Sequence, residues 1–129
     1  MIEPGTVYTL QFTVAEPHTA LAVGSGTLPV LASPVLAAKL EECAWRAAAP
    51  FLEAGSSTVG TRLDLKHLSP TPMGMSVTCR AEITNADGRR LVFSLSASDE
   101  AGPVGEGTHE RVIVQDKRFL DKAEGKASV

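Results

Sequence analysis

Polar and apolar residues alternate along several segments of the chain, and this alternation is typical of β-strands with one buried face. The segments lie at residues 7–14, 58–67, 75–83, 91–98 and 104–115. An Asp-Gly pair separates the third segment from the fourth, and a Gly-Pro pair separates the fourth from the fifth, so both connections are expected to be tight turns. Because short turns join neighbouring strands in opposite directions, the pattern predicts mostly antiparallel pairing.

The segment of residues 33–50 has the composition of a helix. Ser33 is a typical N-cap, Pro34 fits the first helical position, and Pro50 is expected to end the helix after an alanine-rich body. The few charged residues of this segment are Lys39, Glu41, Glu42 and Arg46. A helix that is otherwise apolar all round is usually enclosed, which predicts that a curved sheet wraps around it.

The order of elements is strand, loop, long helix and then four strands. This order predicts an α+β fold in which an antiparallel sheet of about five strands curls around one central helix. The length of 129 residues suits a single domain over residues 1–129. Two parts of the chain lack a sustained hydrophobic periodicity. They are a lid-like loop at about residues 15–32 and a polar C-terminal tail at about residues 116–129, which is expected to fray. Pairing of open sheet edges between two subunits predicts a homodimer.

Composition and charge narrow the functional classes. The net charge is −3 and the basic residues are scattered, so the chain lacks the clustered Lys and Arg that nucleic-acid binding requires. Cys43 and Cys79 form no CxxC pair and are expected to be reduced and structural, with no zinc site. The N-terminus lacks the pattern of a signal peptide, and no apolar run reaches membrane-spanning length. We therefore expect a cytoplasmic protein without a membrane partner.

One titratable residue stands where an apolar residue is expected. Strict alternation places five residues of the second segment on its buried face: Val59, Thr61, Leu63, Leu65 and His67. An imidazole there has two interpretations. It is either a histidine at the edge of the core with one backbone partner, or a general base, which needs a partly dry ring with a pKa near the working pH. This pattern alone leaves both open.

Two further candidate functional residues lie on the predicted helix. Capping alone explains Ser33, but a hydroxyl at a helix N-terminus also lies where the helix dipole stabilises an oxyanion. Of the neighbours Glu41 and Glu42, at least one must point away from the sheet, and the other needs a partner such as a histidine. Hydroxyl, carboxylate and imidazole together suit acyl transfer. Ser33 and Glu41 lie about 12 Å apart on a straight helix, so they share a site only if the helix begins later or if two subunits supply different members, and a site at the dimer interface is the simpler solution.

Four stretches of the sequence, in order, resemble one protein family. They are ECAWRAAAPFLEAG, VGTRLDLKHLSPTPMG, DGRRLVFSLSASDE and GTHERVIV. The chain resembles the hotdog-fold acyl-CoA thioesterases, and most closely the fluoroacetyl-CoA thioesterase group. The resemblance covers nearly the whole chain beyond the N-terminal strand, and it implies a hotdog fold.

The resemblance also implies a set of site residues. The family's catalytic threonine falls on Ser33, which keeps the hydroxyl, its glutamate falls on Glu41 and its histidine falls on His67. The family's active-site glycine falls on Gly60, where a missing side chain would let a thioester approach the backbone. Its arginine falls on Arg111, for which a salt bridge at the end of a strand is the competing interpretation.

The activity implied by the resemblance is hydrolysis of a small acyl-CoA thioester, with no cofactor because coenzyme A is part of the substrate. The stretch AVGSGTLPVLAS lacks the phenylalanines of the family's lid, which favours a general short or medium acyl-CoA over fluoroacetyl-CoA. A non-catalytic acyl-CoA-binding module and, with less support, an enoyl-CoA hydratase are the alternatives. By charge alone, four residues are candidates for the CoA phosphates: Arg62, Lys66, Arg89 and Arg90.

Overall fold

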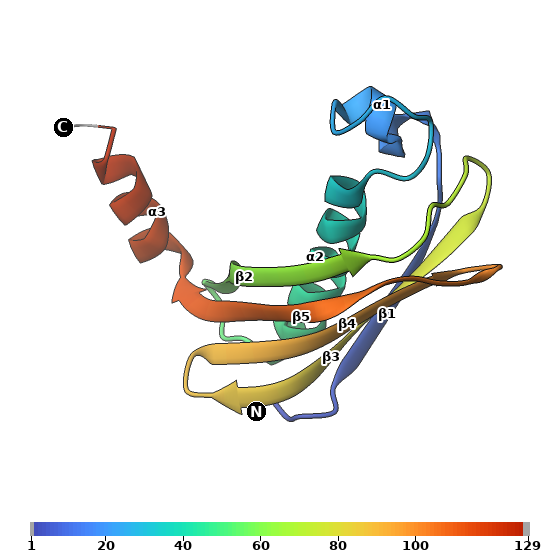
Figure 1. The fold of residues 1–129 in the computed structure, drawn as a ribbon. Helices are drawn as coiled ribbons and strands as arrows, with labels where there is room; N and C mark the ends of the chain where they lie inside the picture. The colour runs from blue at the N-terminus through green and yellow to red at the C-terminus, as the bar shows by residue number, and fades with distance from the viewer. Residues whose placement is uncertain (1, 128–129) are drawn as a thin grey trace.

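The computed structural model describes residues 2–127 and forms one curved antiparallel sheet around a central helix (Figure 1). The sheet order is β1-β3-β4-β5-β2. The strands are β1 (Val7–Thr13), β2 (Ser56–His67), β3 (Ser76–Asp87), β4 (Arg90–Asp99) and β5 (Gly102–Gln115). Every neighbouring pair is antiparallel, as the short turns predicted. The expected α+β arrangement is confirmed.

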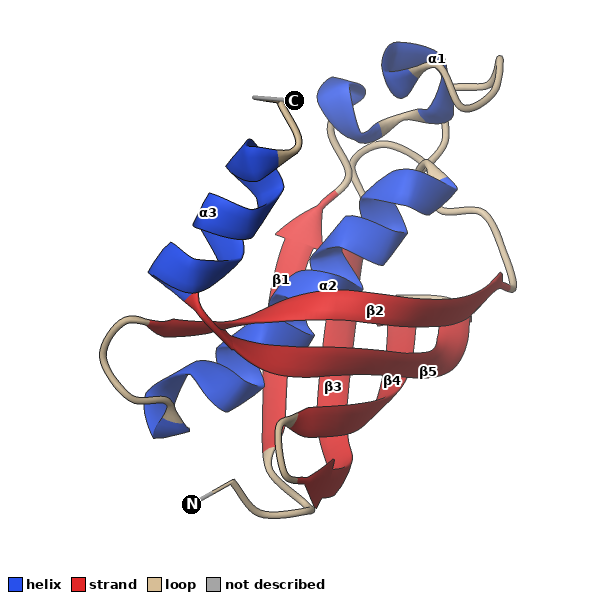
Figure 2. Ribbon diagram, turned by 90° about the vertical axis from the view of Figure 1, so that its left-hand side faces the viewer, coloured by secondary structure: helices blue, strands red, loops and turns tan. Residues whose placement is uncertain are grey.

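The long helix α2 (Ser33–Ala48) crosses the concave face of the sheet and continues into the short helix η2 (Ala49–Phe51) (Figure 2). Its buried residues share one side of the helix: Leu36, Leu40, Cys43, Ala44, Ala47 and Ala48. They pack against the inward row of β3 and β4: Val77, Cys79, Ala81, Ile83, Leu91, Phe93 and Leu95. Each fully buried leucine or phenylalanine contributes roughly 1.5–3 kcal/mol, so this contact fixes the helix on the sheet.

The start of α2 differs from the prediction. Ala32 is the N-cap, Ser33 is the first helical residue, and no side chain caps the helix. Pro34 is therefore the second helical residue. The Ser33 hydroxyl is consequently free to bond elsewhere, and the expectation that it caps the helix is wrong.

The strand β2 breaks the strict alternation that the sequence suggested. A β-bulge shifts its register against β5 between Gly60 and Arg62. Gly60 pairs with Arg111 before the bulge, whereas Leu63 pairs with His109 after it. Paired residues on neighbouring strands face the same side of a sheet, so the inward row is even-numbered before the bulge and odd-numbered after it. The placement of Val59 on the same face as His67 is therefore wrong.

Two segments without a period contain short helices. Residues 15–32 form the 3-10 helix η1 (Glu16–His18) and the helical turn α1 (Ala20–Val23) above the start of α2 (Figure 1). The tail is a helix, α3 (Asp116–Gly125), which corrects the expectation of fraying there. An i,i+4 pair between Lys117 and Asp121 supports this helix. The last two residues of the predicted tail, 128 and 129, lie outside the described residues.

The sheet is open, with β1 and β2 at its two edges. The β2 edge is long and runs from the end of α2 to the loop beside the start of α2 (Figure 1). Within residues 2–127, no helix is long and apolar enough to cross a membrane.

Candidate active site

The first cluster of polar side chains joins the start of α2 to the end of β2. The Ser33 Oγ lies 2.7 Å from the His67 Nδ1. Burial lowers the pKa of His67 below its usual value, and the nearby Ser69 backbone opposes that shift. The His67 Nε2 is buried and has no hydrogen-bond partner among the described residues. A neutral imidazole in contact with a hydroxyl is the arrangement that a general base requires.

The two tautomers of this imidazole offer different chemistry. With the hydrogen on Nε2, the Nδ1 accepts a hydrogen bond from the Ser33 hydroxyl and makes it more nucleophilic. With the hydrogen on Nδ1, the ring donates to the Ser33 Oγ, and the buried Nε2 is left as an unpartnered acceptor that could take a proton only from a water admitted with the substrate. The pair can therefore serve either serine attack or direct water attack.

The second cluster lies where the edge strand β2 and its neighbour β5 face α2, around Gly60. A Cβ added at Gly60 would lie 3.1 Å from the Glu41 Oε2, 3.2 Å from the His109 Cε1 and 3.4 Å from the Arg111 Nη1. The glycine thus lets a helix carboxylate approach the strand closely. Glu41 is partly exposed, with 41% of its side chain accessible, whereas its neighbour Glu42 pairs with Arg46 on the outside of α2. Glu41 therefore approaches Gly60 on the sheet but stays partly exposed, and Glu42, with 31% of its side chain accessible, has Arg46 as its partner.

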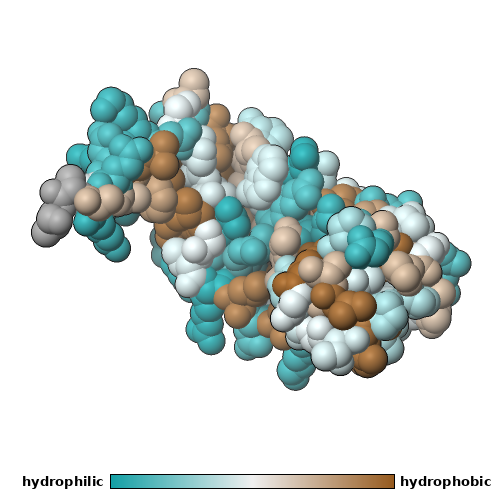
Figure 3. Space-filling view, turned by 90° about the horizontal axis from the view of Figure 1, so that it is seen from above, coloured by the Kyte–Doolittle hydropathy of each residue, from teal (hydrophilic) through white to brown (hydrophobic). Residues whose placement is uncertain are grey.

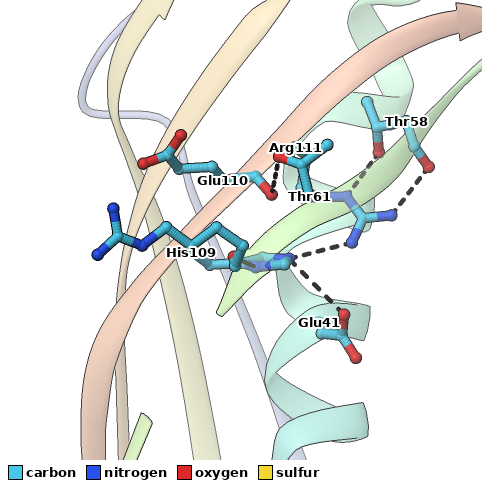
Figure 4. A network of polar contacts seen from close by, with 7 residues as sticks. Glu41, Thr58, Thr61, His109, Glu110 and Arg111 are labelled. Carbon is cyan, nitrogen blue, oxygen red and sulfur yellow. Dashed lines mark hydrogen bonds and ion pairs between the residues drawn. The ribbon is translucent and has the colours of Figure 1, made fainter. Parts of the chain in front are cut away.

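Arg111 is a buried guanidinium held on three sides (Figure 4). Its Nε donates to the Thr58 Oγ1 and its Nη2 to the Thr58 carbonyl, both at 2.8 Å, while its Nη1 donates to the His109 Nε2 at 3.1 Å. Burial lowers the pKa of Arg111, and the nearby Glu41 carboxylate counteracts this. Arginine nevertheless stays charged in proteins. Arg111 forms no salt bridge with a carboxylate among the described residues, which disfavours a role as a strand-end ion pair.

The inward neighbour of Arg111, His109, is the polar residue that the sequence interpretation missed. It is 1% exposed, and its ring centroid lies 5.9 Å from that of Phe93 with the two planes tilted by 35°. Its Nδ1 donates to the Arg62 carbonyl at 2.7 Å, so its Nε2 is the acceptor for Arg111 and lies 4.0 Å from the Glu41 Oε2. Burial, aided by the charge of Arg111, lowers the pKa of His109. The signal was present, because His109 and Arg111 share the parity of one strand face.

These contacts divide the predicted residues into two groups. Ser33 and His67 form one, and Glu41, Gly60 and Arg111 form the other. Because α2 is continuous from Ser33 to Ala48, the eight-residue separation of Ser33 and Glu41 amounts to about 12 Å along the helix. One substrate carbonyl cannot contact both groups within a single chain. Among residues 2–127, no group of three or more His, Cys, Asp and Glu residues is placed to hold a metal ion.

Comparisons with known proteins identify relatives of this chain. A family model described as fluoroacetyl-CoA-specific thioesterase, FlK, matches residues 14–117. The chain belongs to the fluoroacetyl-CoA-specific thioesterase family. It is 37% identical over 97 residues to the fluoroacetyl-CoA thioesterase of Streptantibioticus cattleyicolor, which covers 75% of this chain and 70% of that protein.

Solved structures extend the likeness to the fold. A structure of the fluoroacetyl-CoA thioesterase FlK matches with a TM-score of 0.92 at 32% identity and covers 98% of each chain. A thioesterase superfamily member from Thermus thermophilus matches with a TM-score of 0.91 at 24% identity, over 99% of this chain and 95% of that one. The hotdog fold expected from the sequence is confirmed, since a hot-dog-like protein from Thermanaerovibrio acidaminovorans also matches with a TM-score of 0.89.

A Gly60→Ala substitution tests the close approach in the second cluster. The added methyl group would press on the Glu41 carboxylate and the His109 ring, both nearer than ordinary contact. We expect turnover of an acyl-CoA to fall by about tenfold or more, because small displacements of catalytic groups are costly. The free energy of unfolding should change by less than about 1 kcal/mol, because the Glu41 side chain can move toward solvent. Unchanged turnover in steady-state assays would show that this contact is not used.

Proposed function

We propose that this protein hydrolyses acyl-CoA thioesters to a free acid and coenzyme A. Membership of the fluoroacetyl-CoA-specific thioesterase family supports the reaction class. The observation that carries the proposal for this chain is the 2.7 Å contact between the Ser33 hydroxyl and the imidazole of His67. It provides a nucleophile and a base side by side, which acyl transfer requires.

The proposed chemistry forms one carbon–oxygen bond and breaks one carbon–sulfur bond. Water, or the Ser33 hydroxyl by way of an acyl-enzyme that water then hydrolyses, attacks the thioester carbonyl while His67 takes the proton. The tetrahedral intermediate then collapses, and CoA leaves as a thiolate that receives a proton. Glu41 supplies the carboxylate, which acts either as the nucleophile or as the group that orients the other reacting groups. Backbone N–H groups near the start of α2 stabilise the oxyanion, because helix N-termini favour negative charge.

Gly60 and Arg111 are proposed to bind the substrate. Three of the five guanidinium hydrogens of Arg111 go to Thr58 and His109, which leaves two donors. The Nη1 lies 3.4 Å from the position that a Cβ of Gly60 would occupy, so a substrate oxygen that approached Gly60 in place of the Glu41 carboxylate would meet a fixed positive charge. The charge is already oriented by three hydrogen bonds, and such preorganisation is the main source of electrostatic stabilisation in enzymes.

The separation of the two clusters supports a homodimer with the active site at the subunit interface. The edge strand β2 carries Thr58 and Gly60 in its first half and ends at His67. If two copies pair antiparallel along β2 about a two-fold axis, the end of one strand lies beside the beginning of the other. The Ser33 and His67 pair of one protomer then faces the Glu41 and Arg111 cluster of its partner. Each dimer would have two such sites.

The acyl group is proposed to be short or medium in length. The fluoroacetyl-CoA thioesterase relative is named for fluoroacetyl-CoA, and its structures include a threonine-to-serine variant in complex with acetyl-CoA. Ser33 supplies a serine hydroxyl in this chain. The segment above α2 exposes the aliphatic side chains Leu21, Val23 and Leu28 rather than phenylalanines, which supports a less selective acyl site.

The reaction is proposed to need no metal ion or cofactor, because the hydroxyl, imidazole and carboxylate supply the nucleophile and the proton transfers. Reduced Cys43 and Cys79 are both buried, and free thiols suit the cytoplasmic location that we propose. A binding module without turnover and an enoyl-CoA hydratase remain distinct outcomes of the test below.

Release of free CoA from a panel of acyl-CoA esters tests the proposal. We expect turnover by the wild type and a loss of about 10²–10⁴-fold in His67→Ala, the usual contribution of a general base. His18→Ala is the matched control, because His18 lies in η1 and bonds to the Ala15 backbone instead. Tight binding of esters without CoA release would leave a binding module. Hydration of an enoyl-CoA without thioester cleavage would indicate a hydratase.

The pH dependence of turnover follows from the environment of His67. A general base works in its neutral form, and burial lowers the pKa of His67 below the ordinary value of 6.5. Turnover should therefore rise with pH as His67 loses its proton, and the midpoint should lie below pH 6.5. A profile of kcat/KM against pH measures this midpoint. A midpoint above that value would show that the imidazole is stabilised in its charged form instead.

A further inference from the structure

A groove lies between α3 and the outer face of the sheet, apart from both polar clusters. It encloses about 670 Å³. Its main lining residues are Arg89, Val112, Val114, Arg118, Phe119 and Lys122. Phe119 is 41% exposed, so an aromatic face remains accessible there. In Figure 3, hydrophobic surface lies at the foot of the hydrophilic helix at the left of the view.

The groove concentrates positive charge in a chain whose net charge is −3. Arg89, Arg118 and Lys122 form no salt bridge with any carboxylate among residues 2–127, and no acidic residue lines the groove. The hollow on the other side of α3 differs in charge, because Glu53 and Asp121 are part of its wall. Three unneutralised cations around an apolar floor suit a ligand that carries several negative charges and an aromatic ring.

A second hollow, on the α2 side of the sheet, shares one wall residue with this groove. It encloses about 360 Å³ between the end of α2 and the start of β2, and its wall includes Arg111, Thr58, Ser57 and Ser56. Ser56 also lines the basic groove. From Gly60 to Ser56 is four residues, or about 13 Å along a strand. To reach the groove from Arg111, a long flexible arm would pass the two serines and turn around the start of β2, because the groove lies on the outer face of the sheet.

We propose that this groove binds the nucleotide end of coenzyme A, with the 3′-phosphate and the diphosphate against the three cations and the adenine on Phe119. The proposal rests on the proposed function, because it assigns one part of the same substrate. The proposal also distinguishes among the cationic residues that charge alone selected as candidates for the CoA phosphates. Arg90 is occupied by Glu110 at 2.9 Å, and Lys66 lies beside Asp64 and Glu106, whereas Arg89 faces the groove.

Two substrates with the same acyl group separate this role from catalysis. An acyl-CoA carries the nucleotide, whereas the acyl-pantetheine thioester carries the same reacting centre without it. In an Arg118→Ala, Lys122→Ala double variant, we expect KM for the acyl-CoA to rise about tenfold or more, since hydrogen bonds to charged groups are the stronger ones. The kcat for both substrates and the KM for the acyl-pantetheine should stay unchanged. Lys126→Ala is the control, because Lys126 follows α3 but does not line the groove.

Binding of adenosine 3′,5′-bisphosphate, measured by calorimetry, tests the site without any turnover. Saturable binding to the wild type that weakens about tenfold or more in the double variant would support the nucleotide site even if no ester were hydrolysed. If the wild type hydrolysed no ester, that result would count against the proposed function but not against the nucleotide site. Equal binding by the wild type and the double variant, or an equal rise of KM for both substrates, would overturn the nucleotide site.

Discussion

A Glu41→Gln variant is expected to lose about 10²–10⁴-fold in kcat for acyl-CoA hydrolysis, the range of an acid–base group. The carboxylate lies above Gly60, beside a charged guanidinium and a neutral imidazole, where it can act on a thioester carbonyl. Glutamine has nearly the same shape but neither the charge nor the basicity. Its fold should be retained, because the Glu41 side chain is 41% accessible and its ion-pair partner His109 lies 4.0 Å away on the sheet rather than on α2.

The adjacent residue provides the matched control. Glu42→Gln removes a carboxylate from the same helix turn, but Glu42 only pairs with Arg46 at 2.9 Å on the outer side. A surface pair of this kind contributes roughly 0–1 kcal/mol, so turnover should stay near that of the wild type. Initial rates of CoA release compare the two variants. Equal losses in both would show that charge on α2, rather than the Glu41 carboxylate at Gly60, matters for the reaction.

A Gly107→Ala variant is expected to lose stability by about 3 kcal/mol, the upper part of the usual range for overpacking. A Cβ at residue 107 would overlap the Asp64 carbonyl on β2, which is backbone and cannot rotate away. β5 cannot shift freely, because it is held between β4 and β2. The strain must therefore separate the two strands that carry Gly60 and Arg111.

The free energy of unfolding in urea measures this loss. Gly125→Ala is the comparison, because residue 125 ends α3 and a Cβ there would meet no atom within 4 Å. Alanine is the better helix former, so this variant should be as stable as the wild type or slightly more stable. A Gly107→Ala protein with wild-type stability would contradict the close strand contact.

The fold could be predicted from the sequence wherever the pattern is local. Alternation in β3 and β4 placed the inward rows correctly, because those strands pair with few irregularities over a single buried face. The same rule failed in β2, because a bulge between Gly60 and Arg62 reverses the parity and depends on pairing with β5. The helix α3 was missed because its polar sequence buries no residue and gives no apolar stripe.

The candidate site, like the fold, could be predicted only in part from the sequence. The hydroxyl and the imidazole were recognisable as residue types, but Ser33 looked like a cap until the structure placed Ala32 there and bonded Ser33 to His67. His109 went unrecognised because its role depends on the Arg62 carbonyl at the bulge and on Arg111 across the same face. The shared parity of His109 and Arg111 was visible in the sequence, but the contacts of His109 with the Arg62 carbonyl and of Ser33 with His67 join distant segments and have no signature in spacing.

The measurement that tests the account most directly is the activity of mixed dimers. His67→Ala and Glu41→Gln proteins would be purified separately, allowed to exchange subunits and assayed for CoA release. If each site takes Ser33 and His67 from one protomer and Glu41 from the other, a mixed dimer has one intact site. An equal mixture should then recover about a quarter of the wild-type rate, because half of the dimers are mixed. No recovery, with subunit exchange verified, would contradict a site shared between protomers.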